Sequence, residues 1–156
     1  MDYALEATYY RTALLLGLVR GEEVLRWAVQ AIDREQEPRR ELIDVVSLSP
    51  HDLSELRHAL WPLVIEPDPR VVVEAIFGLL HADLSTGRRS LADTLTVLRQ
   101  MRSMLRMPPP LYAALNDADV AYTTAGGQEA ILATWLEQFA HVGLAQLQST
   151  SGMGEA

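Results

Sequence analysis

The 156-residue sequence contains no cysteine, and none of its 13 basic residues is a lysine. Without a thiol the chain has no disulfide, no thiolate zinc site and no cysteine nucleophile. Without lysine it has neither a Schiff-base nucleophile nor a P-loop, whose lysine contacts phosphate. The exclusive use of arginine is attributed to the codon usage of the source genome.

Aromatic residues make up only 6% of the chain, and long apolar runs are missing. The two longest runs are Ala13–Val19 and Val71–Leu80, the second interrupted by Glu74. Both are shorter than the roughly 20 residues that a membrane-spanning helix needs. The first six residues carry two acids instead of the positive charge of a signal peptide. We therefore expect a cytoplasmic protein with no membrane partner.

Acidic residues outnumber basic ones by 21 to 13, which gives a net charge of −8. This balance argues against a nucleic-acid partner, because affinity for phosphates comes from clustered cations. With 49% hydrophobic and 22% charged residues, the composition is that of a globular protein. The length predicts one helical domain over residues 1–148, followed by a flexible Ser/Gly-rich tail over 149–156.

Start and stop signals of helices recur along the chain. Ser49 followed by Pro50 is typical of an N-cap and the first helical position, and Ser90 with Asp93 resembles a capping box. The run Pro108–Pro110 ends the helix that precedes it. The spacing of apolar residues predicts a last helix from Gln128 to about Leu147.

A helix over residues 70–86 is apolar on nearly every side, which is typical of a helix surrounded by others. Its three consecutive valines also suit a strand, but a 17-residue span favours a helix. With seven or eight helices and no convincing strand, the sequence predicts an all-α protein. We expect a single compact bundle with this apolar helix at its centre.

The four histidines, His51, His58, His81 and His141, are separated by 7, 23 and 60 positions. A metal site on a helix needs ligands three or four residues apart, and no such pair of histidines occurs. His51-Asp52 matches the dipeptide of metal-dependent phosphohydrolases, but the chain holds no earlier histidine ligand. Glycine-rich phosphate loops and the nucleophile elbow are absent as well. We therefore predict no metal, no cofactor and no catalytic residue.

Charges are segregated along the sequence. Residues 88–106 hold five arginines and one acid, whereas residues 111–156 hold five acids and no cation. On a helical wheel Arg99, Arg102 and Arg106 fall within about 60° of one another. One interpretation is that the arginine stems cover the edge of the core. The other is a partner-binding surface formed by these arginines together with Asp117 and Asp119.

Three functional hypotheses follow. The chain resembles the small, acidic, helical inhibitor and immunity proteins of bacterial toxin systems in its size, its charge and its lack of catalytic motifs. This resemblance rests on no aligned residue. The leading hypothesis is a non-enzymatic protein-binding module whose acidic surface masks a basic partner. The alternative is a helical scaffold in which the arginine surface binds a second copy. The third is a small-ligand binder or enzyme with a pocket near Glu74 and His81.

Overall fold

The computed structural model describes residues 3–64, 69–127 and 129–142. Within these ranges the chain forms eight α-helices and one short 3₁₀ helix and contains no strand. The prediction of an all-α protein with about eight helices is confirmed. None of the helices in these ranges is long and apolar enough to span a membrane.

The helices group into two compact units, one formed by the chain before residue 68 and one by residues 68–147. A division by packing does not decide whether the chain folds cooperatively, so one domain over residues 1–148 stays a prediction. The predicted tail, 149–156, lies outside the described residues.

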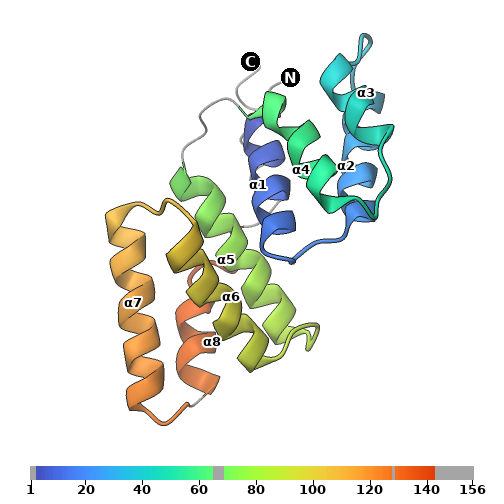
Figure 1. Ribbon diagram of the computed structural model, residues 1–156. Helices are drawn as coiled ribbons and strands as arrows, with labels where there is room; N and C mark the ends of the chain where they lie inside the picture. The colour runs from blue at the N-terminus through green and yellow to red at the C-terminus, as the bar shows by residue number, and fades with distance from the viewer. Residues whose placement is uncertain (1–2, 65–68, 128, 143–156) are drawn as a thin grey trace. The chain divides into compact units, whose positions relative to one another are not determined.

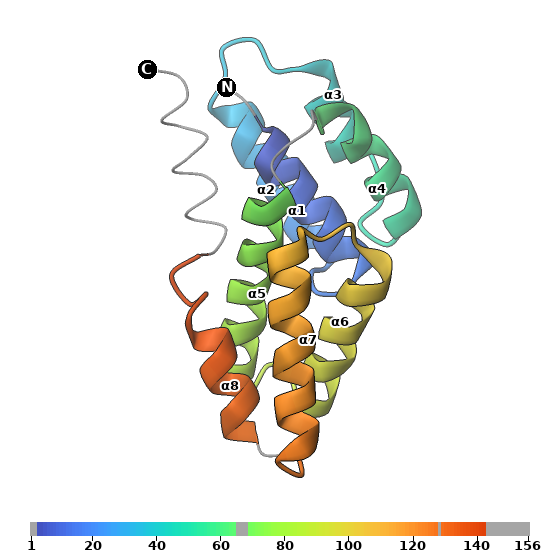
Figure 2. The ribbon, with the colours of Figure 1, turned by 90° about the vertical axis from the view of Figure 1, so that its left-hand side faces the viewer.

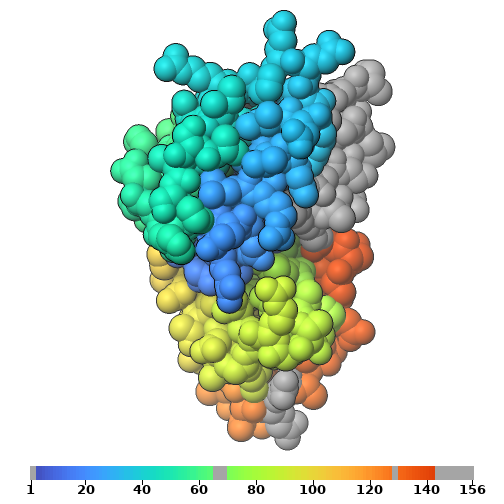
Figure 3. Space-filling model, turned by 90° about the vertical axis from the view of Figure 1, so that its right-hand side faces the viewer, coloured from blue at the N-terminus to red at the C-terminus, as the bar shows by residue number. Residues whose placement is uncertain are grey.

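The first unit contains four α-helices and the 3₁₀ helix. They are α1 (Ala4–Leu15), α2 (Gly21–Asp33), α3 (Arg40–Val46), α4 (Leu53–Leu60) and η1 (Trp61–Leu63). Helix α1 packs against α4 and η1, α2 packs against α3, and α3 packs against α4 (Figure 1). Figure 3 shows one face of this unit, where α2 in blue lies beside α3 in teal.

Aromatic rings of α1, of its N-cap residue Tyr3 and of α2 lie in the core of the first unit. The Trp27 ring contacts the rings of Tyr3 and Tyr10, with centroids 6.2 and 5.2 Å away. The indole N–H of Trp27 donates a hydrogen bond to the carboxylate of Glu6, which is only 1% exposed. Burial, with the nearby Glu35 carboxylate, raises the pKa of Tyr3 to about 12.

Helix α4 begins later than the sequence suggested. Its N-cap is Asp52, whose side chain accepts a hydrogen bond from the backbone N–H of Glu55 at 3.2 Å. The prediction that Ser49 and Pro50 start a helix is wrong, because these residues turn against the first residue of α2. A Cβ added at Gly21 would lie 1.8 Å from the Pro50 carbonyl oxygen, so this approach requires glycine.

The second unit contains α5 (Pro69–Ser85), α6 (Leu91–Met104), α7 (Pro109–Thr124) and α8 (Glu129–Glu137). Helix α5 packs against α6 and α8, and α7 packs against the same two helices (Figure 2). The valine-rich segment is helical, as predicted, and four residues of α5 are completely buried. These are Ala75, Ile76, Phe77 and Leu80. Gly78 is buried as well.

Local sequence signals predicted the start of α6 correctly but not the end of α8. The Ser90 hydroxyl accepts a hydrogen bond from the backbone N–H of Asp93 at 3.1 Å, which confirms the predicted cap. Helix α8 ends at Glu137 instead of about Leu147, because residues 138–141 turn and bring the backbone of Val142 against α5. Phe139 in this turn packs on Phe77, with ring centroids 4.9 Å apart.

Candidate functional site

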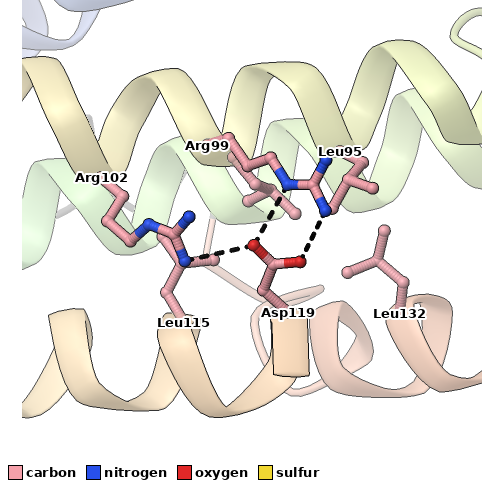
Figure 4. Close-up of a pocket in the computed structure, with 7 residues that line it drawn as sticks. Leu95, Arg99, Arg102, Leu115, Asp119 and Leu132 are labelled. Atoms are coloured by element: carbon pink, nitrogen blue, oxygen red, sulfur yellow. Dashed lines mark hydrogen bonds and ion pairs between the residues drawn. The ribbon is translucent and has the colours of Figure 1, made fainter. Parts of the chain in front are cut away.

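Two arginines on α6 and one aspartate on α7 form an ion-pair cluster between these helices (Figure 4). Arg99 donates from Nε and Nη2 to the two carboxylate oxygens of Asp119, at 3.1 and 2.9 Å. Arg102 lies one helical turn later, and its Nη1 is 3.2 Å from Asp119 Oδ2. The cluster therefore joins two guanidinium groups to one carboxylate and carries a net charge of +1.

Electrostatics favour the ionised forms of Asp119 and Arg99. The hydrogen bonds from Arg99, with the charges of both arginines, hold the pKa of the Asp119 carboxyl below its usual value, although partial burial opposes this. The same hydrogen bonds raise the pKa of Arg99. Asp119 is thus an anion at any pH near neutrality.

Four leucine side chains and one further hydrogen bond support the ion-pair cluster. Leu95 and Leu98 of α6, Leu115 of α7 and Leu132 of α8 form an apolar floor that leaves no space for a water molecule (Figure 4). Arg102 Nη1 also donates to the Asn116 side-chain oxygen at 3.1 Å. Since water is excluded beneath the ion pairs, their attraction is screened less than on an open surface.

Of the five residues predicted to bind a partner, the fold brings three together. Arg106 lies beyond the end of α6 at Met104, because the backbone becomes extended at Leu105. The helical wheel that grouped Arg106 with the other two arginines therefore does not apply to it. Asp117 is exposed on α7, and no described residue forms an ion pair with it.

An open groove of about 440 Å³ adjoins the ion-pair cluster. Its walls combine the three charged residues with polar and apolar side chains of α7. These are Asn116, Val120, Thr123 and Thr124. Their spacing of three and four residues places them on one side of the helix, facing the arginines of α6.

A second groove, of about 300 Å³, lies between α3 and α4 in the first unit. We call it the acidic groove, because Glu41 and Asp44 of α3 and Glu55 of α4 line it. No ion-pair partner for these three carboxylates occurs among the described residues. His58, Leu48, Ala59 and Pro62 complete the lining.

Sequence reasoning missed the acidic groove. Glu41 and Asp44 are three residues apart, as are Glu55 and His58, so each pair shares one side of its helix. This spacing was the available signal. It did not show that the two helices pack with these sides adjacent, which depends on the loop between them.

The third hypothesis concerned Glu74 and His81 on α5. Glu74 forms an ion pair with Arg70 one turn earlier on the same helix, with Nε and Oε1 3.0 Å apart. Seven residues separate Glu74 from His81, or about 10.5 Å along the axis. A pocket at these residues stays a prediction.

Metal binding and similarity to other proteins give no further assignment. Within the described ranges, no group of three or more histidine, aspartate or glutamate side chains could hold a metal ion. Comparisons of the chain with models of protein families, with curated protein sequences and with solved structures give no match.

Proposed function

We propose that this protein is a non-enzymatic binding module that masks a basic site on a protein partner, and that the acidic groove is its contact surface. The observation that carries the proposal is the set of carboxylates of Glu41, Asp44 and Glu55, which have no ion-pair partner among the described residues. A cytoplasmic location is part of the same proposal.

The distribution of charge between the two units supports this choice of surface. Residues 1–67 contain twelve acids and seven arginines, so most of the negative charge of the chain lies in the first unit. In the second unit, by contrast, Asp119 already neutralises part of the arginine cluster on α6. Excess charge of one sign attracts a partner of opposite charge and raises the association rate.

The lining of the acidic groove suits an arginine or lysine side chain of the partner. Leu48, Ala59 and Pro62 offer apolar surface to the methylene stem of such a side chain. The carboxylates would then receive its charged head, and a guanidinium would bind a carboxylate through two parallel hydrogen bonds.

An exposed tryptophan strengthens the proposal. Trp61 directly precedes Pro62 and is 58% exposed, and the guanidinium of Arg11 lies over its ring at 4.6 Å from the centroid. Tryptophan and arginine are enriched among the residues that dominate binding energy in protein interfaces. We expect Trp61 to lie at the edge of the bound partner.

The test compares two triple variants with the same change in charge. The groove variant combines Glu41→Gln, Asp44→Asn and Glu55→Gln. The control variant replaces three exposed acids elsewhere, Glu22→Gln, Asp117→Asn and Glu137→Gln. Proteins captured from the cell of origin by the wild-type chain are purified, and their affinity for each variant is measured by titration calorimetry at several salt concentrations.

We expect the groove variant to lose the partner and the control variant to keep it, with an affinity that falls as salt increases. Circular dichroism confirms that both variants fold. Equal binding by the two variants would contradict the proposed contact surface. A captured partner with no basic surface would contradict the proposed function itself.

The scaffold hypothesis remains the alternative. It requires the arginines of α6 to bind an acidic surface of a second copy, although Asp119 of the same chain already neutralises one of the two charges of Arg99 and Arg102. A sedimentation coefficient that rises with protein concentration would favour the scaffold over the binding module.

A further inference from the structure

The ion-pair cluster between α6 and α7 has more hydrogen-bond donors than it uses. A guanidinium carries five N–H donors. Arg99 uses its Nε–Nη2 edge on Asp119, whereas Arg102 uses only Nη1, on Asp119 and Asn116. The Nε–Nη2 edge of Arg102 therefore has no acceptor among the described residues.

We propose that the groove beside this cluster binds the carboxylate group of a ligand, with two parallel hydrogen bonds from the free edge of Arg102. This edge presents two parallel N–H groups at the spacing of two carboxylate oxygens. Arg99, whose side chain is 50% exposed, adds a second positive charge beside the bound carboxylate. The proposal is independent of the acidic groove and of its basic partner.

Arg102 is held in place before any ligand arrives. Its side chain is only 26% exposed, and two acceptors fix its Nη1. A planar group held at one nitrogen loses little further freedom when its other edge binds, so the conformational cost of binding is small. Asp119 and Asn116 thus act as positioning residues for the ligand contact.

The charge of the cluster selects a singly charged ligand group. Two guanidiniums and one carboxylate leave a net charge of +1, which a carboxylate neutralises. A phosphate dianion would leave excess negative charge next to Asp119, whose carboxylate is 12% exposed at the wall of the groove. We therefore expect a carboxylate to bind more tightly than phosphate.

The remaining lining indicates the rest of the ligand. Val120 is 57% exposed and offers apolar contact, and the hydroxyls of Thr123 and Thr124 offer hydrogen bonds. The volume of about 440 Å³ suits a short organic acid or one acidic side chain of a peptide. Both sources present the same carboxylate, and the experiment distinguishes them.

The experiment follows the Nε–Hε signals of the arginines by ¹⁵N nuclear magnetic resonance. The full chain is titrated with sodium butyrate, with an acetylated and amidated Ala-Glu-Ala peptide, and with sodium phosphate, all at constant ionic strength set with sodium chloride. We expect saturable shifts of the Arg102 signal with butyrate, with the peptide, or with both. Tighter binding of butyrate identifies a free organic acid, and tighter binding of the peptide identifies a protein carboxylate.

Two variants at Arg102 and one control test the contact. Arg102→Lys keeps the charge but removes the fork, and Arg102→Gln removes both. We expect each to weaken carboxylate binding by about tenfold or more, the loss of a charge-assisted hydrogen-bonded pair. Arg106→Gln makes the same charge change outside the groove and leaves the affinity unchanged.

Three results would overturn the proposal. The first is an Arg102 signal that shifts no more with butyrate or peptide than with chloride. The second is phosphate binding as tight as carboxylate binding. The third is an equal loss of affinity in Arg102→Gln and Arg106→Gln, provided that melting curves show both variants folded.

Discussion

Substitution of Gly78 by alanine separates the effect of helix propensity from that of tertiary packing. In an ordinary helix interior, glycine to alanine stabilises the fold by about 1 kcal/mol. Here a Cβ at position 78 would lie 1.7 Å from the carbonyl oxygen of Val142 and 2.8 Å from that of Phe139. Both obstacles are backbone atoms, so the turn that follows α8 has to move away from α5.

The cost of this movement can be worked from the packing of Phe139. Phe139 is 7% exposed, and its ring packs against the rings of Phe77 and Trp135, with centroids 4.9 and 5.4 Å away. Removing a buried phenylalanine side chain costs about 3–5 kcal/mol. After the gain in propensity, we expect Gly78→Ala to lower the free energy of unfolding by about 2–4 kcal/mol.

Urea unfolding followed by circular dichroism measures this free energy. Ala82→Gly, at an exposed position of α5, calibrates the difference between alanine and glycine in the same helix. In a double-mutant cycle, Gly78→Ala should cost less in the Phe139→Ala background, because the displaced ring is already gone. A Gly78→Ala protein as stable as the wild type would refute the close approach of the turn to α5.

Three further predictions concern burial, pH and cooperativity. Leu80 is fully buried in α5. Leu80→Ala should therefore lower the free energy of unfolding, measured by urea titration, by about 2–5 kcal/mol. A change under about 0.5 kcal/mol would contradict its core position. Because the folded-state pKa of Asp119 is lowered, its ionisation stabilises the fold above the unfolded value near pH 4, and this contribution is lost as pH falls further. The wild type should therefore lose more stability than Asp119→Asn on acidification below about pH 4, and parallel pH profiles would contradict the ion pair. If the chain is one domain, the two units should unfold in a single thermal transition. In the Trp135→Phe protein, fluorescence reports Trp27 and Trp61 of the first unit, and its transition should coincide with that of the circular dichroism of the whole chain. Two separate transitions would show two domains.

The sequence by itself determined the fold class and many element boundaries, because these depend on interactions between neighbours in the chain. The Ser90 cap joins residues three apart, and the apolar character of α5 is visible in any window of its sequence. The start of α4 was mispredicted because the Ser49-Pro50 signal lies just before Asp52, the residue whose side chain caps the helix. The backbone of Pro50 instead lies against Gly21, far away in the sequence.

The candidate sites show the limit of the sequence more directly. Charge segregation indicated Arg99, Arg102 and Asp119 as contact residues, but it did not show that they contact one another across 20 positions of the chain. Likewise, the composition predicted an acidic surface without placing it between α3 and α4. Helix formation depends on residues three or four positions apart, so the sequence alone predicts it. Ion pairs and grooves between helices depend on loops and on packing that orients one helix against the next, and only the tertiary structure decided them.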